Sequence, residues 1–123
     1  MSCVFCELTS DRFIDETKLS YVFRDAFPVT DLHTLIISKR HVSDYFDLTV
    51  AEREDIQDLL LKHKKLIEQE DQSVSGFNVG NNIGLSAGQT VFHVHTHLIA
   101  RRDGDVESPR GGVRGVIPGK QAY

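Results

Sequence analysis

The stretch QTVFHVHTHLIA, Gln89 to Ala100, sets three of the chain's six histidines at every second position. Val, Thr, Phe and Ile surround these histidines, and such a run predicts a β-strand over residues 90–100. Successive side chains of a strand point to opposite faces, so His93, His95 and His97 are expected to share one face. The residues between them then point the other way.

Three further segments have the composition of strands. They cover residues 19–25, 33–39 and 76–80, and Pro28 and Asp31 predict a loop between the first two. The polar segment between the third strand and the histidines has glycine at every fourth position. We expect it to be a loop whose backbone can approach a ligand closely.

One helix is predicted between the second and third of these strands. Thr49 and Glu52 have the spacing of a capping box. A stripe of residues at helical spacing follows, and it should pack on a sheet: Ile56, Leu59, Leu60, His63 and Ile67. The order of elements predicts an α+β domain, with a largely antiparallel sheet and one main helix packed on it.

Composition and charge limit the classes of protein to which the chain can belong. A chain of 123 residues is long enough for one domain with a real core, and its net charge of −4 gives no field that attracts a nucleic-acid polymer. No apolar run has the length of a membrane span, and the N-terminal residues lack the pattern of a signal peptide. We therefore expect a cytoplasmic protein, no membrane partner and two reduced cysteines.

The histidine row has three interpretations: a solvated strand face, a zinc site with open positions for water, or a nucleophilic centre. Three same-face residues span about 13 Å at a rise of about 3.3 Å per residue, which disfavours a metal centre of all three. An imidazole with a pKa near 6.5 is neutral at neutral pH and can attack phosphorus. One ring nitrogen must then be held protonated, so that the other keeps its lone pair.

The residues His93-Val94-His95-Thr96-His97-Leu98-Ile99 resemble the histidine triad signature, in which His alternates with apolar residues. Thr96 takes the place of one apolar residue. The stretch FRDAFPVTDLHTLIISKRHV, residues 23–42, is similar to the strand pair of the same family, with Leu32 for a usual glycine and Ser38 for a usual proline. Residues 81–95, NNIGLSAGQTVFHVH, resemble the family's approach to the triad. The chain thus resembles the histidine triad (HIT) family of nucleotide hydrolases and transferases over residues 3 to about 100.

This resemblance implies a role for each matching residue. His95 would be the nucleophile on the α-phosphorus of a nucleotide, and His97 would contact the phosphate or steady the nucleophile. Two further catalytic residues, Gln89 and Thr90, would bind phosphoryl oxygens and the leaving group. The nucleotide-binding residues would be Asp25 at the ribose, Phe5 and Phe23 beside the base, Asn82 in the phosphate pocket and His33 as a support behind the triad.

The N-terminal CVFC, residues 3–6, is a second motif. A Cys-x-x-Cys pair in a cytosolic chain is either a redox pair or half of a zinc site. Family members with this pair add two histidines, which here correspond to His41 and His93. The resemblance therefore implies a structural Zn²⁺ held by Cys3, Cys6, His41 and His93, with no organic cofactor.

The expected function is a hydrolase that cleaves a nucleoside 5′-phosphate from its leaving group through a phosphohistidine. The leaving group would be a polyphosphate, as in diadenosine tetraphosphate, or an amine, as in a nucleoside phosphoramidate. A nucleotidyltransferase or phosphorylase and a nucleotide-sensing module without turnover are the alternatives. The resemblance also implies a homodimer. We assign residues 1–100 to the HIT domain and residues 101–123, which resemble an extension of a bacterial subgroup, to a C-terminal arm.

Overall fold

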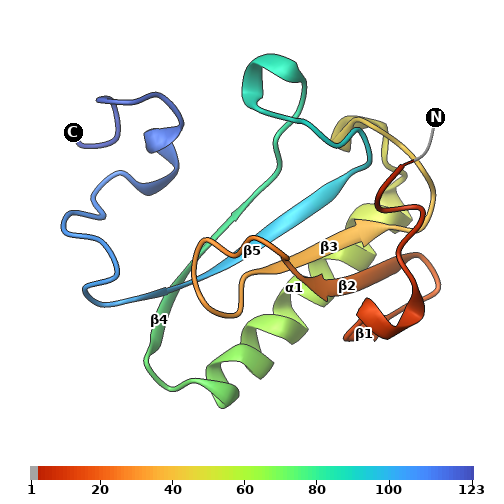
Figure 1. Ribbon diagram of the computed structural model, residues 1–123, viewed down its shortest axis with the longest axis horizontal. Helices are drawn as coiled ribbons and strands as arrows, with labels where there is room; N and C mark the ends of the chain where they lie inside the picture. Colours follow the sequence, from red (N-terminus) through yellow and green to blue (C-terminus); the bar gives the residue numbers. More distant parts are fainter. Residues whose placement is uncertain (1–2) are drawn as a thin grey trace.

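The computed structural model describes residues 3–123, and it consists of one antiparallel sheet with one long helix across a single face (Figure 1). The sheet order is β1-β2-β3-β5-β4. The strands are β1 (Asp15–Glu16), β2 (Ser20–Arg24), β3 (Thr34–Ser38), β4 (Val74–Gly80) and β5 (His95–Arg102), and the helix is α1 (Val50–Glu70). Four short 3-10 helices complete the chain: η1 (Ser10–Arg12), η2 (Tyr45–Asp47), η3 (Leu85–Ala87) and η4 (Gly112–Val116). The predicted α+β class with one main helix is confirmed.

Helix α1 begins as its sequence predicts. The Thr49 hydroxyl accepts a hydrogen bond from the Glu52 amide at 3.1 Å, and the Glu52 carboxylate accepts one from the Thr49 amide at 2.8 Å. The Glu52 carboxylate also accepts a hydrogen bond from Arg40 at 2.8 Å. This bond, together with those from Thr49, lowers the pKa of Glu52 to about 2. Glu52 thus ties the start of the helix to the segment that follows β3.

The core has one part on each face of the sheet. Toward α1, Val22, Ile36 and Leu98 are buried against the helix stripe predicted from the sequence. His63 belongs to this stripe, and its Nε2 lies 2.8 Å from a carboxylate oxygen of Asp15, so it has a partner within the fold. The opposite face of β2 and β3 is covered by the N-terminal segment through a smaller apolar cluster of Phe5, Leu8, Phe13, Tyr21, Phe23, Leu35 and Ile37.

The turn before β3 contains a strained residue. Leu32 has a φ of 71°, the left-handed conformation that a glycine adopts without strain. Its carbonyl accepts a hydrogen bond from the Thr34 hydroxyl at 2.8 Å, and its side chain packs against the core beside Leu98. The apolar contacts of the Leu32 side chain therefore offset its backbone strain. The turn still places His33 directly before β3.

The strand predicted over residues 90–100 is wrong at both ends, because β5 runs from His95 to Arg102. Before His95 the chain leaves the sheet, and the Val94 amide donates instead to the Val42 carbonyl at 2.8 Å. His93 therefore precedes β5, whereas His95 and His97 belong to it. The third predicted strand begins earlier than expected, at Val74, and the two-residue β1 carries too little pattern to be found from the sequence.

Within residues 3–123, no helix combines the length and the apolar composition that a membrane span requires.

Candidate active site and metal cluster

Two cysteines and two histidines meet beside the N-terminal end of β5. The Cys6 sulfur lies 3.2 Å from Nδ1 of His41, and both Cys3 and Cys6 lie 3.5 Å from Nδ1 of His93. One potential ligand atom from each of these four residues lies within 4.8 Å of the other three. Nε2 of His93 faces the Ser38 carbonyl at 2.6 Å, so its N–H donates there and Nδ1 is left with a lone pair toward the sulfurs.

The fold explains this meeting of distant residues. The hydrogen bond from Val94 to Val42 sets the neighbouring residues His93 and His41 side by side, with their ring centroids 4.9 Å apart. A turn closed by the Glu7 amide on the Cys3 carbonyl, at 3.1 Å, directs both cysteines to the same side.

These four residues fit a tetrahedral zinc ion. Bond lengths of about 2.3 Å for Zn–S and about 2.0–2.1 Å for Zn–N place neighbouring ligand atoms about 3.3–3.8 Å apart. The separations of 3.2–3.5 Å between sulfur and nitrogen agree closely with that geometry. Two thiolates and two imidazoles would fill all four positions, and the bond from His93 to Ser38 is the type of outer contact that orients a ligating histidine.

His95 is oriented by a main-chain carbonyl. Its Nδ1 lies 2.8 Å from the carbonyl oxygen of His93, so we assign the ring proton to Nδ1 and the lone pair to Nε2. The ring of Phe5 covers it edge-on at 4.9 Å, and the ring of His97 lies at 5.2 Å. His95 therefore has the protonation that a nucleophilic imidazole requires.

A second chain of hydrogen bonds sets the opposite protonation in His97. The Val29 amide donates to Nδ1 of His33 at 3.0 Å, so neutral His33 carries its proton on Nε2. That N–H donates to Nδ1 of His97 at 2.9 Å, and neutral His97 is then protonated on Nε2. This buried Nε2 has no hydrogen-bond partner among the described residues. His97 thus presents a free N–H, whereas His95 presents a free lone pair.

Burial favours the neutral form of both His33 and His97. Burial lowers the pKa of His97 to about 4, and the charges of His95 and His33 act in the same direction. Burial also lowers the pKa of His33, although the negative charge of Asp25 opposes it. The N–H donor of His97 therefore belongs to a neutral ring throughout the physiological pH range. Among ligands, an anion forms the most favourable hydrogen bond with such a desolvated N–H.

Asp25 follows β2, and its carboxylate lies near His33 and His97. One carboxylate oxygen lies 3.5 Å from Nε2 of His33, and the other accepts a hydrogen bond from the Phe27 amide at 2.8 Å. Asp25, His33 and His97 place potential metal ligands within 4.8 Å of one another. Nε2 of His33 carries a proton, however, and this disfavours a metal ion here and with it the zinc-hydrolase interpretation of the histidine row.

The loop before the triad is held by Gln89, which is buried. Its side-chain oxygen accepts from the Gly84 amide at 2.8 Å, and its side-chain nitrogen donates to the carbonyls of Ser43, at 2.8 Å, and Val91, at 3.2 Å. Its amide is thus occupied in shaping the loop, a role that the sequence analysis missed. A direct contact between Gln89 and phosphate stays a prediction.

The remaining predicted residues divide into exposed and buried ones. Thr90 and Asn82 are exposed, and Asn82 lines a cavity that also reaches His97. Phe5 is half-buried, whereas Phe23 is only 3% exposed and meets Phe5 edge-on at 5.6 Å. In this structure Phe23 supports Phe5 from the core. A contact between Phe23 and a base stays a prediction.

Comparison with known proteins finds relatives that are named as enzymes of nucleotides. The chain is 34% identical over 110 residues to adenosine 5′-monophosphoramidase of Candida albicans, covering 83% of this chain and 72% of that protein. It is 40% identical over 89 residues to the asymmetrical bis(5′-nucleosyl)-tetraphosphatase of Schizosaccharomyces pombe, covering 72% of this chain and 48% of that protein.

A solved structure is similar along most of the fold. The crystal structure of a Zn-bound histidine triad family protein from Mycobacterium smegmatis superimposes with a TM-score of 0.78 at 32% identity, covering 87% of this chain and 80% of that one. The family model of the HIT domain matches residues 7–104, which carry the strands, the helix and all three triad histidines. The chain therefore belongs to the HIT family.

Proposed function

We propose that the protein is a nucleotide hydrolase that cleaves a nucleoside 5′-phosphate from its leaving group through a covalent intermediate on His95. One observation carries the proposal: the His95 ring is protonated toward the His93 carbonyl, and the ring of His97, 5.2 Å away, has a buried N–H without a partner among the described residues. A bare nucleophilic nitrogen beside a desolvated donor fits attack on an anionic phosphoryl group. The relatives named for phosphoramidase and tetraphosphatase activity support this class.

The reaction would take two displacements at phosphorus. Nε2 of His95 attacks the α-phosphorus, the bond to the leaving group breaks, and a phosphoryl–nitrogen bond forms. The imidazole gains positive charge in this step, and the hydrogen bond from its Nδ1 to the His93 carbonyl stabilises that charge. Water then attacks the phosphorus, the nucleoside 5′-monophosphate leaves, and His95 becomes neutral again.

The other predicted site residues would bind the substrate. The N–H of His97 donates to a phosphoryl oxygen, with its direction set by His33. Thr90 and Asn82 bind the phosphate from the exposed edge of the loop that Gln89 shapes. Asp25 accepts hydrogen bonds from the ribose, and the base lies against Phe5, with Phe23 behind it.

Zinc belongs to the same proposal as a structural ion. Cys3, Cys6, His41 and His93 would hold it, and their separations match a closed tetrahedral site. The Zn-bound relative from Mycobacterium smegmatis supports this assignment. When bound, the ion would fix the N-terminal segment, and hence Phe5, over the sheet.

Three further expectations stay proposals. The protein forms a homodimer, which β4 favours because it lies at the edge of the sheet. It acts in the cytoplasm, which two free cysteines support. Its HIT domain covers residues 1–100 and its arm residues 101–123.

A substrate panel with an Asp25→Ala variant tests the proposal. Wild-type protein should release AMP from adenosine 5′-phosphoramidate or diadenosine tetraphosphate, and it should prefer ribose to 2′-deoxyribose substrates. Asp25→Ala should raise KM for ribonucleotides about tenfold or more and remove that preference, because a hydrogen bond to a charged group contributes about 1.5–3 kcal/mol. Steady-state kinetics on matched ribose and deoxyribose substrates measures both effects.

Asp31→Ala is the matched control, since it removes an exposed carboxylate from the same loop. It should leave KM and sugar preference unchanged. Equal sugar discrimination by wild type and Asp25→Ala would remove Asp25 from the site. Nucleotide binding without AMP release would favour a sensing module, and release only with an added acceptor would favour a transferase.

A further inference from the structure

The β2–β3 loop, residues 25–33, supplies the backbone amide that sets the protonation of two site histidines. The Val29 amide donates to Nδ1 of His33 at 3.0 Å, and Nε2 of His33 then donates to Nδ1 of His97 at 2.9 Å. The carboxylate of Asp25 lies 3.5 Å from Nε2 of His33, which is longer than a well-formed hydrogen bond. The protonation of both rings therefore depends on where the Val29 amide lies.

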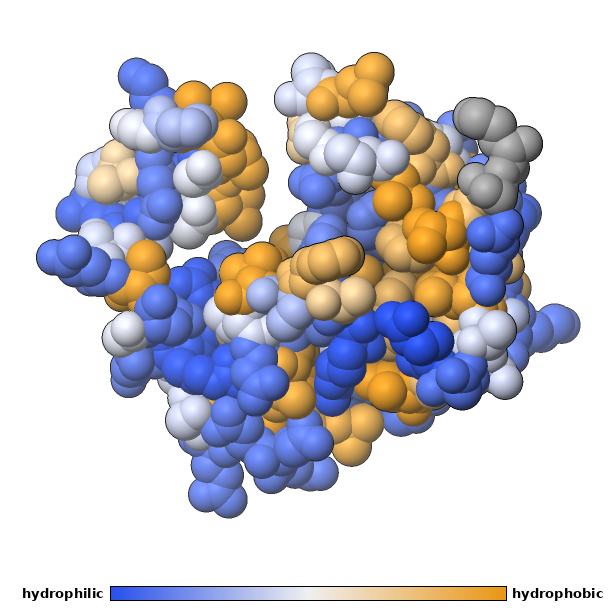
Figure 2. Space-filling view, in the orientation of Figure 1, coloured by the Kyte–Doolittle hydropathy of each residue, from blue (hydrophilic) through white to orange (hydrophobic). Residues whose placement is uncertain are grey.

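The tip of this loop has little apolar packing. Leu32 packs against the core at the base of the loop, but Phe27 and Val29 are 88% and 69% exposed. Figure 2 shows apolar side chains of the loop at the surface, near the centre of the view. A segment with so few buried contacts opens locally at a low cost in free energy. A polar contact is therefore needed to hold the Val29 amide in place.

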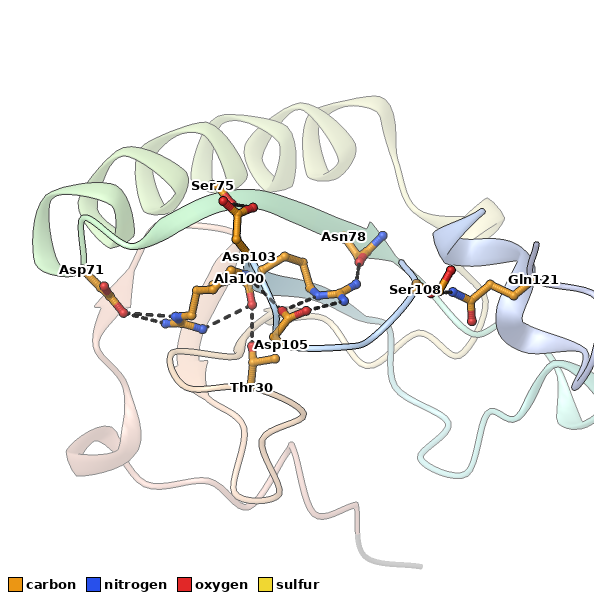
Figure 3. Close-up of polar contacts among 11 residues, drawn as sticks. Thr30, Asp71, Ser75, Asn78, Ala100, Asp103, Asp105, Ser108 and Gln121 are labelled. Atoms are coloured by element: carbon orange, nitrogen blue, oxygen red, sulfur yellow. Dashed lines mark hydrogen bonds and ion pairs between the residues drawn. The ribbon is translucent and has the colours of Figure 1, made fainter. Parts of the chain in front are cut away.

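Thr30, the next residue after Val29, makes such a contact. Its hydroxyl donates to the Ala100 carbonyl at 2.6 Å (Figure 3), and its own carbonyl accepts a hydrogen bond from the His33 amide at 3.2 Å. Among the described residues, the hydroxyl of Thr30 makes the one hydrogen bond that joins residues 26–31 to a part of the chain outside the loop. Thr30 thus anchors the tip of the loop from the position adjacent to the amide.

The acceptor of this bond is a well-held point of β5. Ala100 is fully buried within the sheet. Its carbonyl also accepts a weaker hydrogen bond from Arg102 at 3.4 Å, and the guanidinium of Arg102 is paired with Asp71 at 2.9 Å (Figure 3). Since β5 also carries His97, the bond from Thr30 fixes the loop relative to the strand whose histidine it must orient.

We propose that Thr30 is a positioning residue, whose hydroxyl holds the Val29 amide against His33. Through this contact it keeps the N–H of His97 available to a phosphoryl oxygen, a role in turnover that rests on the proposed function. Without the contact, the proton of His33 can move to Nδ1, and its Nε2 then accepts a hydrogen bond from Nδ1 of His97. Each ring keeps one proton, but His97 then turns a lone pair to the anionic oxygen and repels it.

The protonation of the rings can be measured without substrate, by nitrogen NMR of protein with isotope-labelled histidine. In the wild type, His33 and His97 should each be protonated on Nε2. Thr30→Val has nearly the shape of threonine but no donor, and it should move a measurable share of His97 to the form protonated on Nδ1. Thr30→Ser retains the hydroxyl and should match the wild type. Unchanged ring protonation in Thr30→Val would reject the inference, whether or not the protein hydrolyses nucleotides.

Thr34→Val is the matched control, because it removes the other threonine hydroxyl near this turn. That hydroxyl donates to the Leu32 carbonyl at 2.8 Å and makes no contact with residues 26–31. Thr34→Val should therefore keep the ring protonation of the wild type. An equal change in both valine variants would show a general loosening of the turn, and it would overturn the specific role of Thr30.

A double-variant cycle tests whether Thr30 acts through His97. Thr30→Val should lower kcat/KM for adenosine 5′-phosphoramidate about tenfold, the scale of one hydrogen bond to a charged group, and Thr30→Ser should restore it. In a His97→Ala background, the same Thr30→Val change should alter kcat/KM by less than about twofold, because the group that it orients is gone. Losses that multiply in the double variant would contradict action through His97.

Discussion

His95→Ala should abolish nucleotide turnover while the affinity for AMP stays within about tenfold of wild type. The change removes the nitrogen that we propose forms the covalent intermediate, and the loss should reach about 10³-fold or more in kcat, as for other nucleophiles. Affinity should persist because the groups proposed to bind the nucleotide are untouched: Asp25, Phe5 and the loop shaped by Gln89. Single-turnover kinetics and equilibrium titration with AMP measure the two quantities separately.

His95→Asn is the matched control for packing. Asparagine retains a donor for the His93 carbonyl but has no nucleophilic nitrogen, so it should be as inactive as alanine. His97→Ala should be slower than wild type yet measurably active, since it removes a hydrogen-bond donor only. If His95→Ala retained a tenth of the wild-type rate or more, the phosphohistidine mechanism would be wrong.

A Cys3→Ser, Cys6→Ser double variant should lose bound zinc and melt at a lower temperature than wild type. The protein as isolated should hold one zinc per chain, because Cys3, Cys6, His41 and His93 would fill four tetrahedral positions. Zinc binding and folding are linked, so loss of the ion lowers stability, and acid pH should release it by protonating the ligands. Metal analysis and thermal unfolding measure both effects.

Turnover in the double variant should largely survive at low temperature. The His93 carbonyl that orients His95 is fixed by the hydrogen bond between Val94 and Val42, which needs no metal. Val4→Ser is the control, because Val4 lies between the cysteines and is 56% exposed. Stoichiometric zinc in the double variant would place the ion elsewhere. A folded, metal-free variant without any activity would make the zinc catalytic.

Much of the fold could be predicted because its elements carry local signals. The capping box at Thr49 and the apolar stripe of α1 are spaced by helix geometry, and β2 and β3 follow from runs of β-branched and aromatic residues. The start of β5 could not be predicted in this way. Residues 90–94 have the composition of a strand, but the contact between Val94 and Val42 and the loop contacts of Gln89 draw them out of the sheet.

The part of the candidate site that side chains form could be predicted from the sequence. The part that depends on backbone groups could not. Alternation along the strand gave a common face for His95 and His97, which belong to β5. The groups that set their protonation are the His93 carbonyl and the Val29 amide, and a sequence pattern contains no signal for either.

The stereochemistry of hydrolysis at the α-phosphorus tests the central claim most directly. A nucleotide substrate made chiral at that phosphorus by one sulfur atom would be hydrolysed in water labelled with a heavy oxygen isotope, and the configuration of the product determined. Attack by His95 inverts the phosphorus and attack by water inverts it again, so we expect net retention. Net inversion would show a single direct attack by water and would contradict the covalent mechanism.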